Sequence, residues 1–203
     1  YSSVFENIKD IDHNNENLLE NIKTLKTLIT VVNSRDSYTY NHVNRVYNYC
    51  VLIADYYHIS NTDKKHLFYA AYLHDLGKIK LSKVVLLAEH ELSEKEWDEL
   101  KQHPVDSAEI VRQIDGFENV APIVLQHHER YDGTGYPKGL KGEEINYLAR
   151  ILTVVDSFDA MTNFRPYQET KTFQEALAEI ERCKGTHFDP DIADIFIKAM
   201  SET

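Results

Sequence analysis

Glycine is nearly absent from this chain outside one short stretch, and this scarcity limits the folds open to it. Four of the seven glycines lie between Gly133 and Gly142, and the 203 residues include only five prolines. Glycine and proline are the residues that most disfavour helix interiors, so the rest of the sequence can form helices. No pair of alternating apolar stretches flanks a hairpin turn. The sequence therefore predicts an all-α fold, a helical bundle of about six or seven helices.

Capping residues and apolar stretches place these helices along the chain. Residues 61–63 offer N-caps for a helix that ends near Gly77. Ser93 and Glu96 have the spacing of a capping box at the start of another helix. Further helices are expected after Pro104 and over residues 120–128, 147–161, 173–182 and 191–200.

The first 33 residues carry a separate pattern, a heptad repeat. Its positions are Ile8, Asn15, Ile22 and Ile29 at a, with Leu18 and Leu25 at d. β-Branched residues at a and leucine at d favour a parallel two-stranded coiled coil, and one polar a residue fixes its register. We expect residues 1–33 to link an upstream sensor region to the domain and to form a homodimer contact, and residues 34–203 to form the folded domain. The alternative is an amphipathic helix that folds back on its own domain.

The acidic charge balance excludes several functions. A formal charge of −11 argues against binding to duplex nucleic acid or anionic lipid, because both require a basic surface. No apolar stretch approaches the ~20 residues that cross a bilayer, and two cysteines give no disulfide framework. These features predict a cytoplasmic protein. A first residue that is Tyr and not Met predicts a fragment of a longer chain.

Several polar residues occupy positions where the helical pattern favours apolar ones. They end or interrupt apolar stretches or lie near helix ends: His42, His74, Asp75, His103, His127, His128 and Asp156. A carboxylate buried in a helical core is costly unless it is paired or bound to a metal. Each residue alone is compatible with a hydrogen-bonded core histidine or a capping aspartate. Together, these imidazoles and carboxylates indicate a hydrolytic metal site for Mn, Fe or Zn.

Two segments of the sequence resemble the signatures of a known family. Residues 74–78, HDLGK, resemble the signature of HD metal hydrolases, and residues 127–140, HHERYDGTGYPKGL, resemble the signature of HD-GYP domains. The neighbouring strings agree in content and order: residues 36–45, 103–104, 149–159, 165–167 and 188–190. The resemblance covers residues 28–200.

This resemblance implies an all-helical, metal-dependent phosphodiesterase of bacterial second-messenger signalling. HD-GYP members hydrolyse cyclic di-GMP to linear pGpG, some continue to GMP, and a few prefer a mixed cyclic GMP-AMP dinucleotide. The ligands that it implies are His42, His74, Asp75 and Asp156 for one metal, with Asp75 bridging to a second metal held by His103, His127 and His128. Two divalent ions, Fe or Mn, would activate a bridging hydroxide and hold the phosphoryl oxygens.

One residue that differs from some family members determines how many metal ions we expect. Some members hold a third ion with a Glu four residues before the first ligating histidine, and this chain has Tyr38 there. A phenol is a poor substitute for a bridging carboxylate. The expected site is therefore binuclear.

The resemblance also implies catalytic and substrate-binding residues. Asp75 and Lys78 are the expected catalytic residues, although Lys78 is alternatively only a lysine at a helix C-terminus. Arg165 is expected to bind the phosphate that lies away from the metals, since a guanidinium suits that contact. Lys171 is the candidate substitute for a basic residue of the family, where this chain has Gln168.

The Gly-rich loop at residues 132–139 gives the family its name. Its glycines permit backbone turns that other residues resist. Tyr136 either stacks on a guanine base or shapes the rim of the pocket, and the loop is alternatively a rigid scaffold or a docking surface for partner proteins. Glu129, Asp132 and Asp159 are expected to orient the ligating histidines.

Three functions are compatible with these residues. The first is a cyclic-dinucleotide phosphodiesterase, and the second is a receptor or dimerisation module that binds the dinucleotide and signals through partners. The third is an HD hydrolase of another phosphate, such as a nucleoside phosphate. Intact ligand positions favour the first over the second, and the complete GYP loop disfavours the third.

Overall fold

The computed structural model describes residue 27 and residues 37–88, 90–163 and 170–202. Its elements are α3 (Ser37–Tyr56), α4 (Asn61–Leu73), η1 (Leu76–Lys80), α5 (Lys83–Leu86), α6 (Glu94–Leu100), α7 (His103–Val111), α8 (Val120–Gln126), η2 (Gly142–Glu144), α9 (Tyr147–Thr162), α10 (Phe173–Arg182) and α11 (Pro190–Ser201). These residues form no strand, only an isolated bridge between Lys184 and Phe188. The all-α prediction is confirmed. The heptad predicted over residues 1–33 lies outside the described residues, except for Thr27.

The described residues contain eight α-helices of seven or more residues and the single four-residue turn α5, against the six or seven helices expected. The additional helix is α3, because the sequence pattern placed helices that correspond to α4 and to α6 through α11 but gave no bounds for a helix over residues 37–56. Helices α6 and α7, which were predicted as separate, are joined by only two residues, since α6 ends at Leu100 and α7 begins at His103.

Capping groups set the boundaries of these helices. The predicted capping box forms at the start of α6, where the N–H of Ser93 donates to Glu96 Oε2 over 2.8 Å. At α4 the predicted cap at residues 61–63 is wrong by one residue. Ser60 is the N-cap, and its Oγ accepts a hydrogen bond from the N–H of Asp63 at 3.1 Å, because an N-cap side chain reaches the third residue of the helix.

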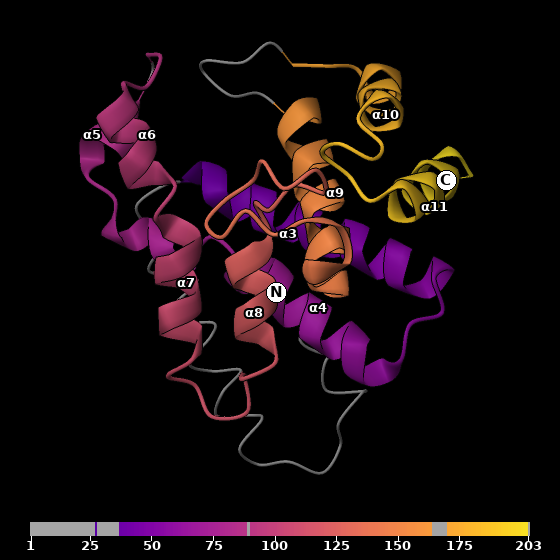
Figure 1. Ribbon diagram of the computed structural model, residues 1–203, viewed down its shortest axis with the longest axis horizontal. Helices are drawn as coiled ribbons and strands as arrows, with labels where there is room; N and C mark the ends of the chain where they lie inside the picture. The colour runs from indigo at the N-terminus through magenta and orange to yellow at the C-terminus, as the bar shows by residue number, and fades with distance from the viewer. Residues whose placement is uncertain (1–26, 28–36, 89, 164–169, 203) are drawn as a thin grey trace.

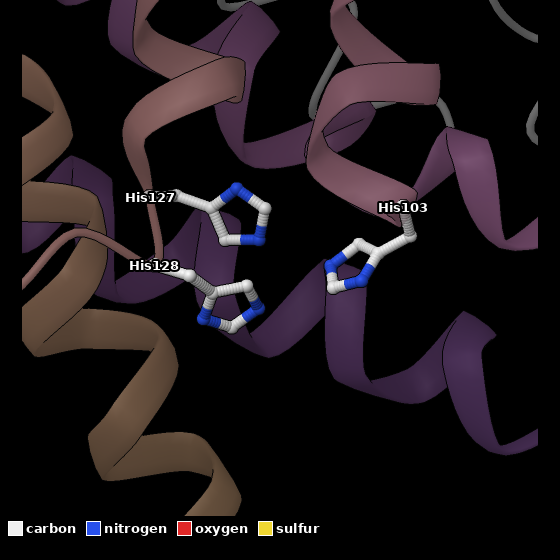
Figure 2. Close-up of side chains that lie close together, drawn as sticks. All are labelled: His103, His127 and His128. Atoms are coloured by element: carbon white, nitrogen blue, oxygen red, sulfur yellow. The ribbon is translucent and has the colours of Figure 1, made fainter. Parts of the chain in front are cut away.

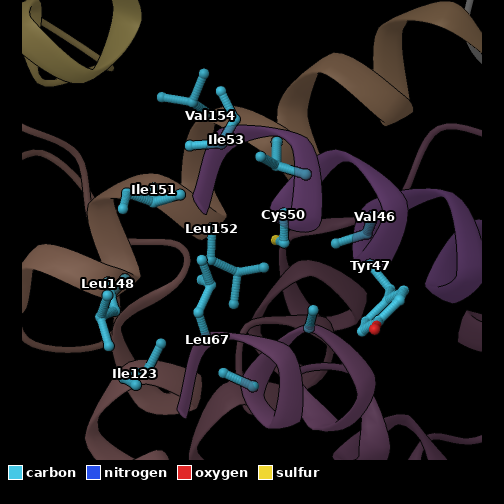
Figure 3. Packing of buried hydrophobic residues seen from close by; sticks show 14 of the residues in the cluster. Val46, Tyr47, Cys50, Ile53, Leu67, Ile123, Leu148, Ile151, Leu152 and Val154 are labelled. Atoms are coloured by element: carbon cyan, nitrogen blue, oxygen red, sulfur yellow. The ribbon is translucent and has the colours of Figure 1, made fainter. Parts of the chain in front are cut away.

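The hydrophobic core includes buried residues of α3, α4, α8 and α9 (Figure 3) and continues into α7, α10 and α11. Helix α9 runs through the middle of the fold (Figure 1), and its Ile151, Leu152 and Val154 are fully buried. Most residues of α9 are buried, as expected of a helix in the interior of a fold. Helices α4 and α8 both pack against α9, and this packing brings the polar residues at their C-terminal ends close to α9. None of the described helices is both long and apolar enough to cross a membrane.

Candidate metal centre

The seven predicted metal ligands come together at one place in the fold. Helix α3 carries His42, α7 begins with His103, and α9 carries Asp156. The other four are the pairs His74–Asp75, directly after α4, and His127–His128, directly after α8. Six of the seven are buried, and His128 is half-buried.

A first group of donor atoms joins His42, His74 and Asp75, all within 4.8 Å of one another. The Nε2 atoms of the two histidines are 3.2 Å apart. Asp75 Oδ2 lies 3.7 Å from His42 Nε2 and 3.5 Å from His74 Nε2. Asp156 reaches the same place from α9, with Oδ1 3.3 Å from His42 Nε2. Two imidazole nitrogens and two carboxylates thus converge, and such atoms are ligands of divalent metals.

A second group joins His103, His127 and His128 within the same 4.8 Å limit. In Figure 2 the ring of His103 points from one side toward the rings of His127 and His128, which lie together on the other side. Asp75 Oδ1 is 3.4 Å from His103 Nε2, whereas its Oδ2 faces the first group. Asp75 therefore lies between the two groups of donors.

Backbone hydrogen bonds determine which ring nitrogen can accept an ion. The Nδ1 atoms of His74, His103 and His127 lie 2.9, 2.7 and 2.6 Å from carbonyl oxygens three residues earlier. A carbonyl only accepts, so these Nδ1 atoms carry the proton. The Nε2 atoms of His103 and His127 are buried without a hydrogen-bond partner among the described residues. Buried polar atoms normally have partners, and a cation would satisfy these two. The donor set therefore fits divalent transition metals.

The protonation states of the second group also suit metal binding. Burial lowers the pKa of His103 to about 4 and that of His127 to about 3. Burial opposes ionisation of Asp75, but the Lys78 ammonium and the surrounding imidazoles outweigh it and hold the pKa of that carboxyl well below its usual range. At neutral pH the two imidazoles are neutral and Asp75 is ionised, which are the forms that bind metals.

His42 differs from the other histidines of the site. Burial would lower its pKa, but hydrogen bonds to the carboxylates of Asp156 and Asp159 raise that pKa to about 9. A metal that binds at His42 must therefore displace a proton at neutral pH. Metal affinity at this position is expected to rise with pH up to about 9 for this reason.

The buried neutral imidazoles predict acid sensitivity of the metal-free protein. An unfolded histidine has a pKa near 6.5, whereas His103 and His127 have values of about 4 and 3 when folded. Below pH 6.5 the unfolded chain binds more protons than the folded chain, so stability that is fully present above pH 6.5 is lost as the pH falls. We expect the free energy of unfolding to drop between pH 6.5 and 5 by up to about 1.4 kcal/mol per pH unit for each of these histidines.

Urea unfolding in EDTA across this pH range measures the effect. His103→Asn should reduce the slope of unfolding free energy against pH, and the same change at His90, which is exposed, should leave the slope unaltered. Equal slopes in the parent protein and His103→Asn would contradict the prediction.

Asp159 contacts His42, one of the predicted metal ligands. Its Oδ2 lies 2.7 Å from His42 Nδ1, and Arg45 donates from Nε to Oδ1 at 2.6 Å and from Nη2 to Oδ2 at 3.0 Å. The guanidinium thereby offsets the charge of a buried carboxylate. No role was assigned to Arg45 from the sequence, although its position three residues after His42 places it on the same face of α3.

Lys78 and Tyr136 lie against the donor groups. Lys78 Nζ donates to Asp75 Oδ2 at 2.7 Å. The ring of Tyr136 stacks on the ring of His128, with centroids 4.9 Å apart and an interplanar angle of 30°. Tyr136 thus contacts a predicted ligand directly.

Glu129 and Asp132 are hydrogen-bonded to the Gly-rich loop. The carboxylate of Glu129 is buried and accepts from the backbone N–H groups of Lys138 at 2.7 Å and Leu140 at 3.0 Å. Asp132 Oδ1 accepts from the N–H of Thr134 at 2.9 Å. The described contacts of Glu129 and Asp132 are with the loop. From the sequence, both residues were predicted to orient histidine rings.

The loop glycines serve two different purposes. Gly133 and Gly139 have φ of +84° and +65°, the left-handed conformation that glycine adopts most readily. Gly135 is required for space, since a Cβ there would lie 2.2 Å from the Arg130 nitrogen and 2.6 Å from the His128 carbonyl oxygen. The backbone of the loop therefore packs directly on the backbone that follows His128.

The predicted substrate contacts are only partly described. Arg165 and Gln168 lie outside the described residues, and the side chain of Tyr38 does as well. Lys171 is half-buried, and its backbone N–H donates to the carbonyl of Met161 near the end of α9 at 2.8 Å.

The fold and its two donor groups agree with a family assignment. The HD domain family matches residues 26–192, which is most of the chain. This chain therefore belongs to the HD domain family, and the predicted resemblance to its HD-GYP members is confirmed.

Curated relatives are similar over most of this chain. The 3'3'-cGAMP-specific phosphodiesterase 3 of Vibrio cholerae is 37% identical over 171 residues, which are 84% of this chain and 37% of the relative. The cyclic di-GMP phosphodiesterase response regulator RpfG of Xanthomonas campestris is 37% identical, over 89% of this chain and 48% of the relative. A cyclic di-GMP phosphodiesterase of Thermotoga maritima is 36% identical, over 89% and 50%. The chain spans half or less of the length of these relatives.

Solved structures share the fold. The crystal structure of a cyclic GMP-AMP specific phosphodiesterase of V. cholerae, V-cGAP3, matches with a TM-score of 0.68 and 22% identity, over 89% of this chain and 48% of that one. Bd1817, described as an HDG"Y"P protein from Bdellovibrio bacteriovorus, matches with a TM-score of 0.65 and 22% identity, over 79% of this chain and 51% of that one. At these identities the similarity establishes the helical fold.

Proposed function

We propose that this chain is the catalytic region of a metal-dependent phosphodiesterase that hydrolyses cyclic di-GMP to linear pGpG. One observation carries the proposal: two groups of buried nitrogen and oxygen donors lie on either side of Asp75, which faces both. The names of the curated relatives support the substrate class, since they are cyclic di-GMP and 3'3'-cGAMP phosphodiesterases. Tyr38 in place of a glutamate favours two metals over three.

The donor set suits a pair of divalent ions, Fe or Mn. His42, His74, Asp75 and Asp156 would hold one, and Asp75 with His103, His127 and His128 would hold the other. Bound there, the ions would supply Lewis acidity, which polarises a phosphodiester and generates a nucleophile from water at neutral pH.

The chain's own residues prepare the site for this reaction. Lys78 holds its ammonium 2.7 Å from Asp75 Oδ2, and from that position it can donate to a phosphate oxygen or to the departing ribose oxygen. Asp159 keeps the ring of His42 oriented through Nδ1, and Arg45 keeps Asp159 in place. Tyr136 supports His128 through ring stacking.

Partner interactions form a second part of the proposal. We infer that residues 1–33 bring two copies together as a homodimer, because their heptad has the a and d residues of a two-stranded coil. Docking of partner proteins on the loop at residues 132–139 is proposed from the family resemblance. Light scattering of the parent protein and of Asn15→Ile tests the first of these proposals, and an unchanged oligomeric state would overturn it.

Anaerobic turnover of cyclic di-GMP tests the proposed activity. The metal-stripped chain is loaded with Mn²⁺ or Fe²⁺, and products are separated by chromatography, with 3'3'-cGAMP as a parallel substrate and EDTA as the control. We expect linear pGpG that depends on added metal. Binding of two metals per chain without a product from either substrate would overturn the enzymatic proposal and favour a dinucleotide receptor.

A further inference from the structure

Two buried hydroxyl groups, on Ser107 and Thr153, bond to the backbone of predicted metal ligands. Ser107 Oγ donates to the carbonyl oxygen of His74 at 2.7 Å and accepts from the N–H of Gly77 at 2.7 Å. Thr153 Oγ1 lies 2.9 Å from the carbonyl oxygen of His127. Both side chains belong to buried residues, at 0% and 4% exposure.

The two histidine carbonyls need these donors. His74 is the C-cap of α4 and His127 is the C-cap of α8. The last carbonyl groups of a helix have no partner inside the helix, and a buried carbonyl without a partner is destabilising. In both places the missing donor comes from a different helix.

The two hydroxyls also connect helices that each carry ligands. Ser107 lies on α7, one turn after His103, so its bond ties the His74 end of α4 to the helix of His103. Thr153 lies on α9, three residues before Asp156, so its bond ties the His127 end of α8 to the helix of Asp156. The same kind of bond thus fixes two of the helix pairs from which the donor groups are built.

We propose that Ser107 and Thr153 are positioning residues of the metal centre, which set the distances between donor atoms on neighbouring helices. The inference rests on the proposed metal-dependent function. A purely structural interpretation treats the bonds as ordinary helix-end contacts, and Thr153 does also lie 2.8 Å from the Ala149 carbonyl one turn earlier. The two interpretations differ in whether losing the hydroxyl weakens metal binding beyond its effect on stability.

The chain offers a matched control for this difference. Thr162 is on α9, and its Oγ1 donates to the Phe158 carbonyl at 2.9 Å, a bond within one helix to a residue that is not a predicted ligand. Thr162→Val and Thr153→Val therefore each remove one hydroxyl from the same helix, although Thr162 is half-buried and its Oγ1 also accepts from Asn163 Nδ2 at 3.2 Å. Thr153→Ser keeps the hydroxyl and serves as the conservative variant.

Calorimetric titration of the metal-stripped full chain with Mn²⁺ tests the proposal, with melting temperatures in EDTA measured beside it. We expect Ser107→Ala and Thr153→Val to weaken Mn²⁺ binding by about 10-fold or more, the range found when groups that orient metal ligands are removed. Thr153→Ser should bind nearly as the parent does. Thr162→Val should lower the melting temperature in EDTA while leaving Mn²⁺ affinity unchanged.

Two results would overturn the inference. If Thr153→Val binds Mn²⁺ as tightly as Thr162→Val does, the Thr153 hydroxyl has only a structural role. If Ser107→Ala does not fold, the comparison of Thr153→Val with Thr162→Val alone tests the positioning role. If the parent binds no Mn²⁺, the proposed metal-dependent function fails, and the positioning role fails with it. Parent binding thus separates the two failures.

Discussion

Replacing Asp75 with alanine is expected to lower the proposed hydrolysis of cyclic di-GMP by at least about 10³-fold. Asp75 Oδ1 lies 3.4 Å from His103 Nε2 and Oδ2 lies 3.5 Å from His74 Nε2, so the substitution deletes an oxygen donor from both groups at once. It also removes the acceptor of Lys78. Loss of one electrostatic contact at an active site already costs about 10²- to 10³-fold in kcat, and a shared donor should exceed that range.

The control for Asp75→Ala is an aspartate far from these contacts. Asp98 is exposed on α6, and Asp98→Ala should retain parental turnover under the same anaerobic assay. Asp75→Asn, which keeps the volume of the side chain, separates the loss of charge from the creation of a cavity. If Asp75→Ala kept turnover within tenfold of the parent, the two donor groups would not be the active site.

Gly135→Ala is expected to destabilise the protein severely and to disturb His128. The added Cβ would lie 2.2 Å from the Arg130 nitrogen, 2.6 Å from the Glu129 Cα and 2.6 Å from the His128 carbonyl oxygen. All three are backbone atoms, so no rotamer change can relieve the contacts. Overpacking of a well-packed site costs about 3 kcal/mol in the severe case. For a chain of this size, that loss of stability lowers the melting temperature by roughly 6–12 °C.

Gly185→Ala separates crowding from backbone strain. Gly185 has φ of +73° but nothing within 4 Å of its added Cβ, so alanine there should cost only about 1–2 kcal/mol for the left-handed conformation. Urea unfolding in EDTA compares the two variants, and calorimetry with Mn²⁺ should show weaker binding only in Gly135→Ala. Equal unfolding free energies for the two variants would show that the loop backbone can move away from His128.

Local signals made much of this fold predictable from the sequence. The capping box of Ser93 and Glu96 marked the start of α6, and polar pairs after apolar stretches marked the ends of α4 and α8. The paired ligand candidates were also predictable, since His74 and Asp75 are adjacent in the sequence, as are His127 and His128. The division of these ligands between two metals came from the family resemblance, because no local sequence pattern indicates it.

Contacts between distant segments were beyond such signals. His42 bonds to Asp159 across 117 positions of sequence, and only folding brings Arg45 to the same carboxylate. Glu129 bonds backbone N–H groups, which every residue except proline carries, so no side-chain pattern identifies its partners. The hydroxyl of Ser107 was missed for the same reason, because its acceptor is a backbone carbonyl.

The two donor groups draw on five helices, from His42 in α3 to Asp156 in α9, and this has a consequence for folding. An ion held by residues so far apart in the chain binds the folded state and not the unfolded one. Such an ion would therefore stabilise the whole domain, by about 2.7 kcal/mol when free metal is at a hundred times its Kd. A chain in which α9 has not yet docked lacks Asp156 and cannot form the first group. If the proposed ions bind, loss of α9 docking would release metal, and a chelator should lower the free energy of unfolding of the domain.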